Sequence, residues 1–310
     1  MAVALITHRA CLGHDPGLGH PESPARLKAV LHALEAEEFS PLLRESAPEA
    51  SREALLRAHT APYVAEILAL APEEGEYRAL DADTIVSTGS VAAALRAAGG
   101  AMAGVDAVME GWARASFVAV RPPGHHAEPS RPMGFCLFNN VAVAALHARA
   151  RWGLKRVAIV DFDVHHGNGT ETIVSPDPDL FYGSSHQSPC YPGTGSAEEH
   201  GIADNIVNVP LPPGTGSRVF RQAWAAAILP GLERFAPDLL LVSAGFDAHK
   251  ADPLAEFRLE TADYTWLTGE LIRIADACTH GRIVSVLEGG YDIEALAASA
   301  AAHVRALMTG

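Results

Sequence analysis

The sequence alternates between short apolar runs and longer stretches rich in Ala and Leu, and this alternation is its strongest constraint on the fold. The short runs have the continuous apolar character of strands that are buried on both faces. They cover residues 3–6, 117–120, 156–160, 180–182, 206–209, 239–242 and 283–287. The stretches with helical spacing cover residues 23–37, 90–109, 141–151, 218–235, 261–277 and 293–308. Strands that alternate with helices predict an α/β fold in which a parallel sheet carries helices on both faces.

The length and composition of the chain fit one large α/β domain. With 310 residues, 48% of them hydrophobic, the chain can bury a sizeable core. The sequence contains no internal repeat, no low-complexity tract and no flexible linker, so we predict a single domain over residues 1–310. Two segments rich in Pro and Gly, 121–134 and 189–195, are expected to be long functional loops within that domain.

Charge, cysteine content and the N-terminal sequence argue against several classes of protein. The formal net charge is −14, and so acidic a surface repels phosphate backbones, which disfavours direct binding of nucleic acid. The four cysteines are widely scattered, which argues against disulfides and thiolate zinc clusters. The N-terminus, MAVALITHRA, resembles a strand more than a signal peptide, and the weakly polar stretch 91–109 is interrupted by charges and glycines. We therefore expect a soluble, cytoplasmic protein without a membrane span.

Unusual polar residues follow five of the predicted strands. The segments are RPPGHH (121–126), DFDVHHGN (161–168), SSH (184–186), SAGFD (243–247) and EGGY (288–291). The carboxyl ends of parallel strands lie along one edge of a sheet, and this edge is where open α/β proteins bind ligands. Segments far apart in the sequence are therefore expected to meet at one site.

The spacing of the acidic residues and histidines predicts a metal site at this edge. Asp161, Asp163 and His165 occupy alternate positions, so in an extended chain their side chains point the same way. Asp247, from a later strand, adds a further carboxylate. Three protein ligands with an open fourth position are typical of catalytic zinc, and the absence of thiolates argues against a structural zinc site. A metal ion held in this way polarises a carbonyl and lowers the pKa of a water towards about 7.

Three further side chains are candidates for proton transfer and carbonyl polarisation. His125 and His126 supply imidazoles that titrate near neutral pH, although such a pair can also cap a turn or bind the metal itself. Asp161 and Asn168 are candidate partners that orient the two rings. Tyr291 follows two glycines, and its phenol is either part of a plain turn or a hydrogen-bond donor to a developing oxyanion.

Taken together, these motifs resemble the zinc-dependent histone deacetylases and the bacterial histone deacetylase-like amidohydrolases. The matching segments are HPESPARL (20–27), RPPGHHA (121–127), GFCLFNN (134–140), DFDVHHGNGT (161–170), YPGTGS (191–196), SAGFDAH (243–249) and LEGGY (287–291). They follow the order of the family over almost the whole chain, and Asn168 and LEGGY are similar to its class II branch. The resemblance implies the arginase–deacetylase fold, with a mainly parallel, eight-stranded sheet and helices on both faces.

The resemblance also implies a role for each residue of the metal and catalytic groups. Asp163, His165 and Asp247 would bind one catalytic Zn²⁺. His126 would act as general base and acid, and Tyr291 would polarise the scissile carbonyl. His125 would be an electrostatic helper paired with Asp161.

Substrate contacts and a second ion follow from the same resemblance. The backbone oxygen of Gly134 would accept the substrate amide hydrogen, Phe135 and Tyr191 would form the walls of a tunnel, and Arg26 would lie at its foot. Leu254 matches the leucine of ordinary family deacetylases rather than the glutamate of polyamine-specific members. A structural K⁺ would be bound by Asp161, Ser184 and the backbones of Asp163, His165 and Ser185. The loops before Arg121 diverge too far to assign the rim residue that holds the substrate backbone.

We therefore predict zinc-dependent hydrolysis of an N-acyl amide, such as acetyl-lysine or a small acetylated amine. One alternative is an acetylpolyamine amidohydrolase, which Leu254 disfavours. A ureohydrolase with two manganese ions is disfavoured because GFDAH supplies only one Asp in the required place. A non-catalytic protein that binds acylated ligands is disfavoured because binding alone needs neither an activated water nor a proton shuttle.

Overall fold

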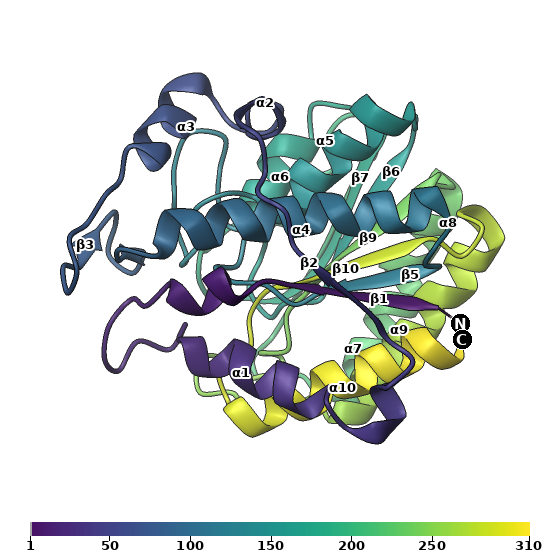
Figure 1. Cartoon of the computed structure of the whole chain (residues 1–310). Coiled ribbons are helices and arrows are strands. Elements are labelled where there is room, and N and C mark those ends of the chain that lie inside the picture. The colour runs from purple at the N-terminus through teal and green to yellow at the C-terminus, as the bar shows by residue number, and fades with distance from the viewer. Residues whose placement is uncertain (1) are drawn as a thin grey trace.

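The structure is a computed structural model that describes residues 2–310, and its centre is an eight-stranded parallel sheet (Figure 1). The strands are β1 (Val3–Thr7), β2 (Leu43–Ser46), β5 (Ala115–Val118), β6 (Val157–Asp161), β7 (Leu180–Gln187), β8 (Ile206–Leu211), β9 (Leu239–Ala244) and β10 (Ile283–Leu287). Their order across the sheet is β2-β1-β5-β10-β9-β6-β7-β8, and every neighbouring pair is parallel. A separate short hairpin joins β3 (Arg78–Ala79) to β4 (Ile85–Val86). The predicted fold class is confirmed.

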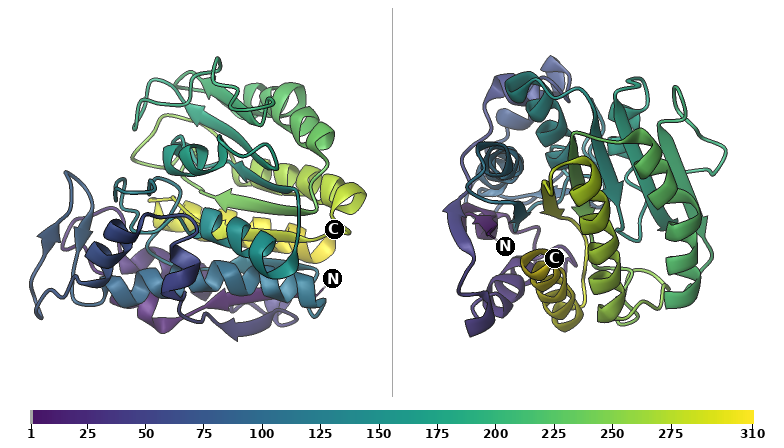
Figure 2. Two further views of the ribbon diagram at one scale, coloured as in Figure 1. Left: turned by 90° about the horizontal axis from the view of Figure 1, so that it is seen from above. Right: turned by 90° about the vertical axis from the view of Figure 1, so that its right-hand side faces the viewer.

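Helices cover both faces of the sheet, as Figure 2 shows. They are α1 (Pro24–Ala33), α2 (Arg52–Leu55), α3 (Ala61–Leu68), α4 (Ser90–Glu110), α5 (Asn140–Trp152), α6 (Asn168–Val174), α7 (Ser217–Ala223), α8 (Leu229–Phe235), α9 (Thr261–Cys278) and α10 (Ile293–Thr309). Helices α4 and α5 pack together on one face, whereas α1, α10, α9 and α8 form a continuous layer on the other. A π-helical turn, Trp224–Ile228, joins α7 to α8, so the predicted helix 218–235 is one nearly continuous rod.

Differences from the predicted strands have physical reasons. Strand β5 begins at Ala115, two residues before the predicted start, because Ala115 and Ser116 already pair with β1 and β10. The hydroxyl of Ser116, which interrupts the apolar pattern, donates a hydrogen bond to the Gly104 carbonyl on α4 (3.2 Å). Strand β7 continues to Gln187 because its polar second half is buried. Strand β2 was not predicted, since its four residues are exposed at the edge of the sheet and carry no apolar pattern.

Within residues 2–310, α4 is the one helix that is long and apolar enough to cross a membrane. Its most apolar window is 61% buried inside the protein, against β1, β5, β10 and α5. A Cβ on Gly99 would lie 2.1 Å from the Pro48 carbonyl oxygen, and one on Gly104 would lie 2.9 Å from Ser116 Oγ. The small apolar residues of α4 thus serve close packing inside the fold, as in the core helix of an α/β domain.

A buried ionic cluster connects the N-terminal segment to the sheet. Glu22 is completely buried, and its carboxylate accepts hydrogen bonds from Arg26 Nη1 (2.9 Å) and from Arg121 Nε and Nη2 (2.5 and 2.6 Å). His14 Nε2 lies 3.3 Å from the same carboxylate. Burial alone would raise the pKa of Glu22, but Arg121, His14 and Arg26 hold that pKa well below its usual range. One carboxylate therefore balances two buried guanidinium groups.

Replacement of Glu22 by Gln is expected to destabilise the protein by about 3–5 kcal/mol, because it leaves two buried guanidinium groups without a counter-charge. Chemical denaturation monitored by circular dichroism measures the change. Glu53→Gln is the matched control, since Glu53 forms an i,i+4 ion pair with Arg57 that is exposed to solvent. The control should shift stability by less than about 0.5 kcal/mol. Equal effects of the two substitutions would contradict the role assigned to Glu22.

The difference in stability between the wild type and Glu22→Gln is expected to depend on pH. The folded-state pKa of Glu22 is depressed, so its stabilising contribution is present above the unfolded-state pKa of about 4.3 and is lost as the pH falls towards the folded-state value. The difference in unfolding free energy between the wild type and Glu22→Gln should begin to narrow below that pH. An equal difference in unfolding free energy at pH 7 and at pH 3 would contradict a depressed pKa of Glu22.

Candidate active site

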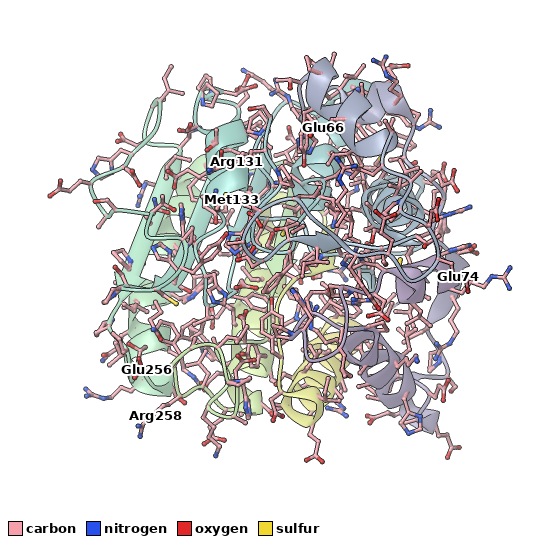
Figure 3. All side chains as sticks on the ribbon, turned by 90° about the vertical axis from the view of Figure 1, so that its left-hand side faces the viewer. Glu66, Glu74, Arg131, Met133, Glu256 and Arg258 are labelled. Carbon is pink, nitrogen blue, oxygen red and sulfur yellow. The ribbon has the colours of Figure 1, made fainter. Side chains whose placement is uncertain are left out.

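The polar segments singled out in the sequence meet at the carboxyl edge of the sheet. Figure 3 looks onto this end of the molecule, where the loops that follow the central strands come together and where Arg131 and Met133 are labelled. Asp161 is the last residue of β6, and it lies in register with Ser184 of β7 and Ser243 of β9. The loops after β5, β6, β9 and β10 carry most of the remaining groups described below. The structure therefore confirms the prediction that these distant segments meet at one edge of the sheet.

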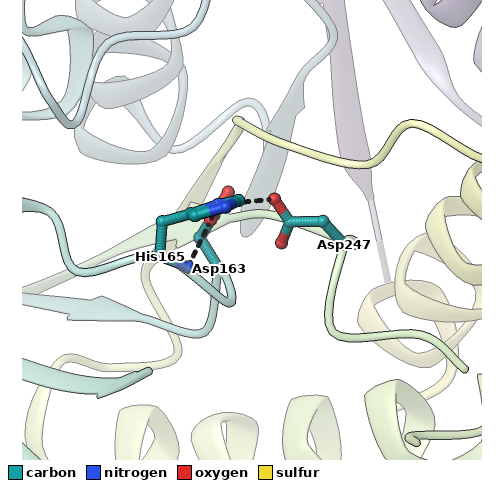
Figure 4. Close-up of side chains that lie close together, drawn as sticks. All are labelled: Asp163, His165 and Asp247. Atoms are coloured by element: carbon teal, nitrogen blue, oxygen red, sulfur yellow. Dashed lines mark hydrogen bonds and ion pairs between the residues drawn. The ribbon is translucent and has the colours of Figure 1, made fainter. Parts of the chain in front are cut away.

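Asp163, His165 and Asp247 form a compact buried group (Figure 4). His165 Nδ1 lies 3.0 Å from Asp163 Oδ1 and 3.2 Å from Asp247 Oδ2. Backbone amides fix both carboxylates: Gly289 N donates to Asp163 Oδ2 (2.8 Å) and Val164 N donates to Asp247 Oδ1 (2.8 Å). Within residues 2–310, this is the one group of three or more His, Cys, Asp or Glu side chains whose donor atoms all lie within 4.8 Å of one another.

The surroundings of this group fit a divalent cation. Burial and the charge of Asp163 raise the pKa of Asp247 to about 7. Burial also disfavours the charged form of Asp163, but His125 and His165 outweigh it and hold the pKa of Asp163 below its usual range. Glycine backbones enclose both carboxylates: a Cβ on Gly289 would lie 2.0 Å from Asp247 Oδ2, and one on Gly245 would lie 2.0 Å from Asp163 Oδ2. Two carboxylates and an imidazole without a thiolate are the donor set of a catalytic zinc site.

The two histidines after β5 have separate partners and opposite electrostatics. His125 Nδ1 lies 2.9 Å from Asp161 Oδ2, and His126 Nδ1 lies 2.8 Å from Asn168 Oδ1. Burial disfavours the charged form of His125, but Asp163 and Asp161 outweigh burial and raise the pKa of His125 to about 10. Burial and the adjacent positive charge of His125 hold the pKa of His126 well below its usual value. One ring is therefore cationic and its neighbour neutral at pH 7.

The tautomer of His126 follows from the hydrogen bonds of Asn168. The amide Nδ2 of Asn168 donates to Glu128 Oε1 (2.9 Å), which leaves Oδ1 as the atom that faces His126. Because Oδ1 only accepts, the neutral ring of His126 carries its proton on Nδ1. Its Nε2 is then a free base, and His126 lines the pocket described next.

A cavity of about 220 Å³ opens onto this group. Its lining residues are Asp83, His126, Gly134, Phe135, His165, Tyr191, Leu254 and Tyr291. The Tyr191 ring packs edge-on against His126 at 5.1 Å, and the Phe135 ring packs edge-on against Tyr291 at 5.8 Å. The predicted tunnel residues Gly134, Phe135, Tyr191 and Leu254 therefore lie around one cavity, together with the predicted catalytic His126 and Tyr291.

The backbone at Gly134 and at Phe135 restricts which residues fit at these two positions of the cavity. Gly134 has φ of 56°, and a Cβ there would lie 2.4 Å from Cδ2 of His126, so only glycine fits beside the histidine. Phe135 adopts φ of 70°, and its amide donates to Thr84 Oγ1 (3.1 Å). This left-handed backbone directs the Phe135 ring towards the cavity.

Contacts to its ring and to its backbone hold Tyr291 in place. The guanidinium of Arg26 lies 4.8 Å from the centre of the Tyr291 ring, and Arg26 also donates to the carbonyl of Gly290 (2.5 Å). The amide of Tyr291 donates to Asp252 Oδ2 (2.7 Å). Arg26 thus links the tyrosine loop to the buried ionic cluster around Glu22.

The residues predicted for potassium lie close together, but each side chain already has a protein partner. Asp161 accepts from the Asp163 amide (3.0 Å) and from Tyr182 Oη (3.0 Å) in addition to His125. Ser184 Oγ lies 3.0 Å from His186 Nδ1. Ser185 accepts from Trp224 Nε1 on the opposite face of β7 (2.8 Å), so only its backbone remains a candidate ligand. Potassium stays a prediction.

Two residues of the site were given no role from the sequence, although the segment that contains Glu288 was expected to reach the site. Glu288 is completely buried, and its carboxylate accepts from the amides of Gly124 (2.6 Å) and His125 (3.2 Å), so it anchors the turn that carries the histidine pair. Its signal was a charged residue directly after an apolar strand. Asp83 lines the cavity, and the DADT segment that positions it is a recognisable Asx turn, in which Asp81 Oδ1 accepts from the amides of Asp83 and Thr84.

The fold and the buried site together define the arginase–deacetylase class of α/β proteins. The chain belongs to the histone deacetylase domain family, whose sequence profile matches residues 20–307. Membership confirms the predicted family, and it supports hydrolysis of an acylated amine as the general activity.

Three comparisons illustrate the relationship. Histone deacetylase 14, chloroplastic, from Arabidopsis thaliana is 41% identical over 318 residues, which cover 96% of this chain and 75% of the relative. A histone deacetylase-like amidohydrolase from Pseudomonas aeruginosa is 42% identical over 279 residues, which cover 88% of this chain and 73% of the relative. The crystal structure of the HDA15 HD domain matches with a TM-score of 0.91 at 35% identity, and the match covers 99% of this chain and 88% of that one.

Asp247→Asn is expected to reduce zinc affinity by more than the roughly 10- to 100-fold that loss of an outer hydrogen-bond partner costs, because it removes a charged ligand. Asparagine can still accept the hydrogen bond from Val164, so the fold should persist. Competition with a chromophoric chelator measures the affinity. Asp179→Asn, which removes a surface carboxylate near Lys155, is the matched control. Full zinc affinity in Asp247→Asn would exclude Asp247 as a ligand.

Proposed function

We propose that the protein is a zinc-dependent deacetylase that hydrolyses a linear N-acyl amide, such as acetyl-lysine or a small acetylated amine. The observation that carries this proposal is the buried Asp163–His165–Asp247 group at the base of a cavity that His126 and Tyr291 also line. A binding protein needs none of this arrangement. Membership of the histone deacetylase domain family supports the same reaction class.

Asp163, His165 and Asp247 would hold one Zn²⁺ beside the cavity, which His165 also lines. Bound there, Zn²⁺ supplies Lewis acidity, which polarises the acyl carbonyl and acidifies a water molecule. The protein fixes the ligands beforehand through the amides of Gly289 and Val164. Such support of ligands from outside the coordination sphere is what sets metal affinity and orientation.

His126 would transfer the proton. Its free Nε2 accepts a proton from the attacking water and later delivers it to the leaving nitrogen, while Asn168 keeps the other ring nitrogen protonated. A neutral ring is required for the first step, and the depressed pKa of His126 provides it. His125, held as a cation by Asp161, would place a fixed positive charge behind the reacting groups.

Tyr291 would stabilise the oxyanion that develops on the acyl oxygen. Arg26 and Asp252 hold the tyrosine by its ring and its backbone, so the phenol is preorganised. The backbone oxygen of Gly134 would accept the amide hydrogen of the substrate. The ring of Phe135 packs edge-on against Tyr291 and restrains it further.

The cavity suggests the class of substrate. A volume of about 220 Å³ between Phe135, Tyr191 and Leu254 fits an extended alkyl chain that carries the amide to its base. Asp83 at the wall adds a negative charge that favours an amine-containing substrate. Leu254 supplies no charge for a polyamine, which supports acyl-lysine or a small acylated amine over acetylpolyamines. A structural K⁺ and a cytoplasmic location stay predictions, as does the absence of direct nucleic-acid binding.

A substrate screen tests the proposal. Zinc-reconstituted protein should release acetate from at least one acetyl-lysine peptide or acetylated monoamine, and a chelator should abolish the release. Acetylated polyamines are the second panel, and preference for them would replace the proposed substrate class. Tight binding of acylated amines without turnover would contradict an enzymatic role.

Tyr291→Phe is expected to lower kcat by roughly 10²- to 10³-fold, because a donor to the oxyanion is lost while the ring and its contacts remain. Zinc content, measured by elemental analysis, should be unchanged. KM should change little, since the hydroxyl acts chiefly in the transition state. Unchanged turnover would remove Tyr291 from the mechanism.

A further inference from the structure

Tyr191 belongs to a loop that side chains, rather than backbone pairing, hold in place. The loop comprises residues 188–196 and follows the end of β7. Within residues 189–195, no backbone–backbone hydrogen bond is present. Tyr191 is 39% exposed, yet its ring covers His126 and lines the cavity. Its position therefore depends on whatever anchors the loop.

Two buried histidines anchor the loop at Thr194 and Gly195, which are three and four residues beyond Tyr191. His166 Nδ1 lies 2.8 Å from Thr194 Oγ1, and His186 Nε2 lies 2.9 Å from the carbonyl oxygen of Gly195. The two imidazole rings lie 4.7 Å apart. A Cβ on Gly195 would lie 2.6 Å from atoms of both rings, so the loop backbone is pressed directly onto them.

The anchors are themselves fixed by regular structure. His166 Nε2 lies 2.9 Å from Glu171 Oε2 on α6, and Asn208 Nδ2 on β8 donates to the same oxygen (2.6 Å). His186 is part of β7 and lies 3.0 Å from Ser184 Oγ. A carboxylate only accepts, so His166 carries a proton on Nε2, and its Nδ1 makes the hydrogen bond with the Thr194 hydroxyl.

We propose that His166 is a positioning residue, which holds the 188–196 loop through Thr194 so that Tyr191 forms the wall against which the substrate chain packs. Thr194 is exposed, but its hydroxyl completes the hydrogen-bonded series that begins at Glu171. The proposal rests on the proposed function for the nature of the substrate. The hydrogen bond between His166 and Thr194, which is called the clamp below, does not depend on that function.

Thr194→Val tests the proposal with the smallest possible change, since it replaces the hydroxyl by a methyl group at an exposed site. KM for the best substrate of the screen should rise about 3- to 10-fold, the factor that the net contribution of one hydrogen bond supplies. The kcat should stay within about twofold, because Thr194 touches neither the metal ligands nor Tyr291. Thr194→Ser keeps the hydroxyl and should restore the wild-type KM.

A double-mutant cycle separates positioning from a general effect on the structure. In a Tyr191→Ala background, Thr194→Val should no longer change KM, because the wall that it positions is absent. Thr265→Val, an exposed threonine on α9, is the matched control and should leave KM unchanged. An equal rise in KM with and without Tyr191 would overturn the proposal.

Backbone order parameters from NMR relaxation test the clamp without any reference to activity. The order parameters of the non-proline residues in 189–195 should be lower in Thr194→Val than in the wild type, in Thr194→Ser and in Thr265→Val. Unchanged order parameters in this segment would overturn the clamp. If the wild type hydrolyses no amide, the proposed function fails, whereas lower order parameters in Thr194→Val would still establish the clamp.

Discussion

The site is organised around two carboxylates that are buried on either side of one imidazole. Asp163 and Asp247 cannot both keep their charge in the protein interior without a compensating positive group. The groups around them therefore have to compensate negative charge. Backbone amides of Val164 and Gly289 offset part of the cost. A divalent cation is the natural completion of the group, and the cavity leaves one side of it open to a ligand.

The support for this group extends into the buried ionic cluster around Glu22. Glu22 balances Arg121 and Arg26, and Arg26 reaches the carbonyls of the segment that ends in Tyr291. Glu288, in the same segment, binds the amides of the turn that carries the histidine pair. The proposed zinc ligands, the proposed base His126 and Tyr291 are therefore supported by one buried polar network.

The sequence predicted the central sheet and the meeting of Asp163, His165 and Asp247, because buried strands have a local apolar pattern and the carboxyl ends of parallel strands lie along one edge. Apolar runs marked the buried strands, and the alternate spacing of Asp161, Asp163 and His165 placed their side chains on one side of an extended chain. Residues whose roles depend on long-range contacts were missed. Glu288 has no local pattern that reveals its contact with the turn after β5, and the edge strand β2 carries no apolar pattern. Asp83 lies in an Asx turn that its sequence allows, but its place at the wall of the cavity depends on the fold.

The floor and the walls of the cavity differ in how much change they tolerate. At the floor, Gly245 and Gly289 touch the carboxylates so closely that even one added methyl group would displace them. At the walls, Tyr191 and Leu254 are each more than a third exposed and project from loops. Substrate preference can therefore diverge among descendants of such a protein by replacement of wall residues, while the reaction itself is inherited unchanged.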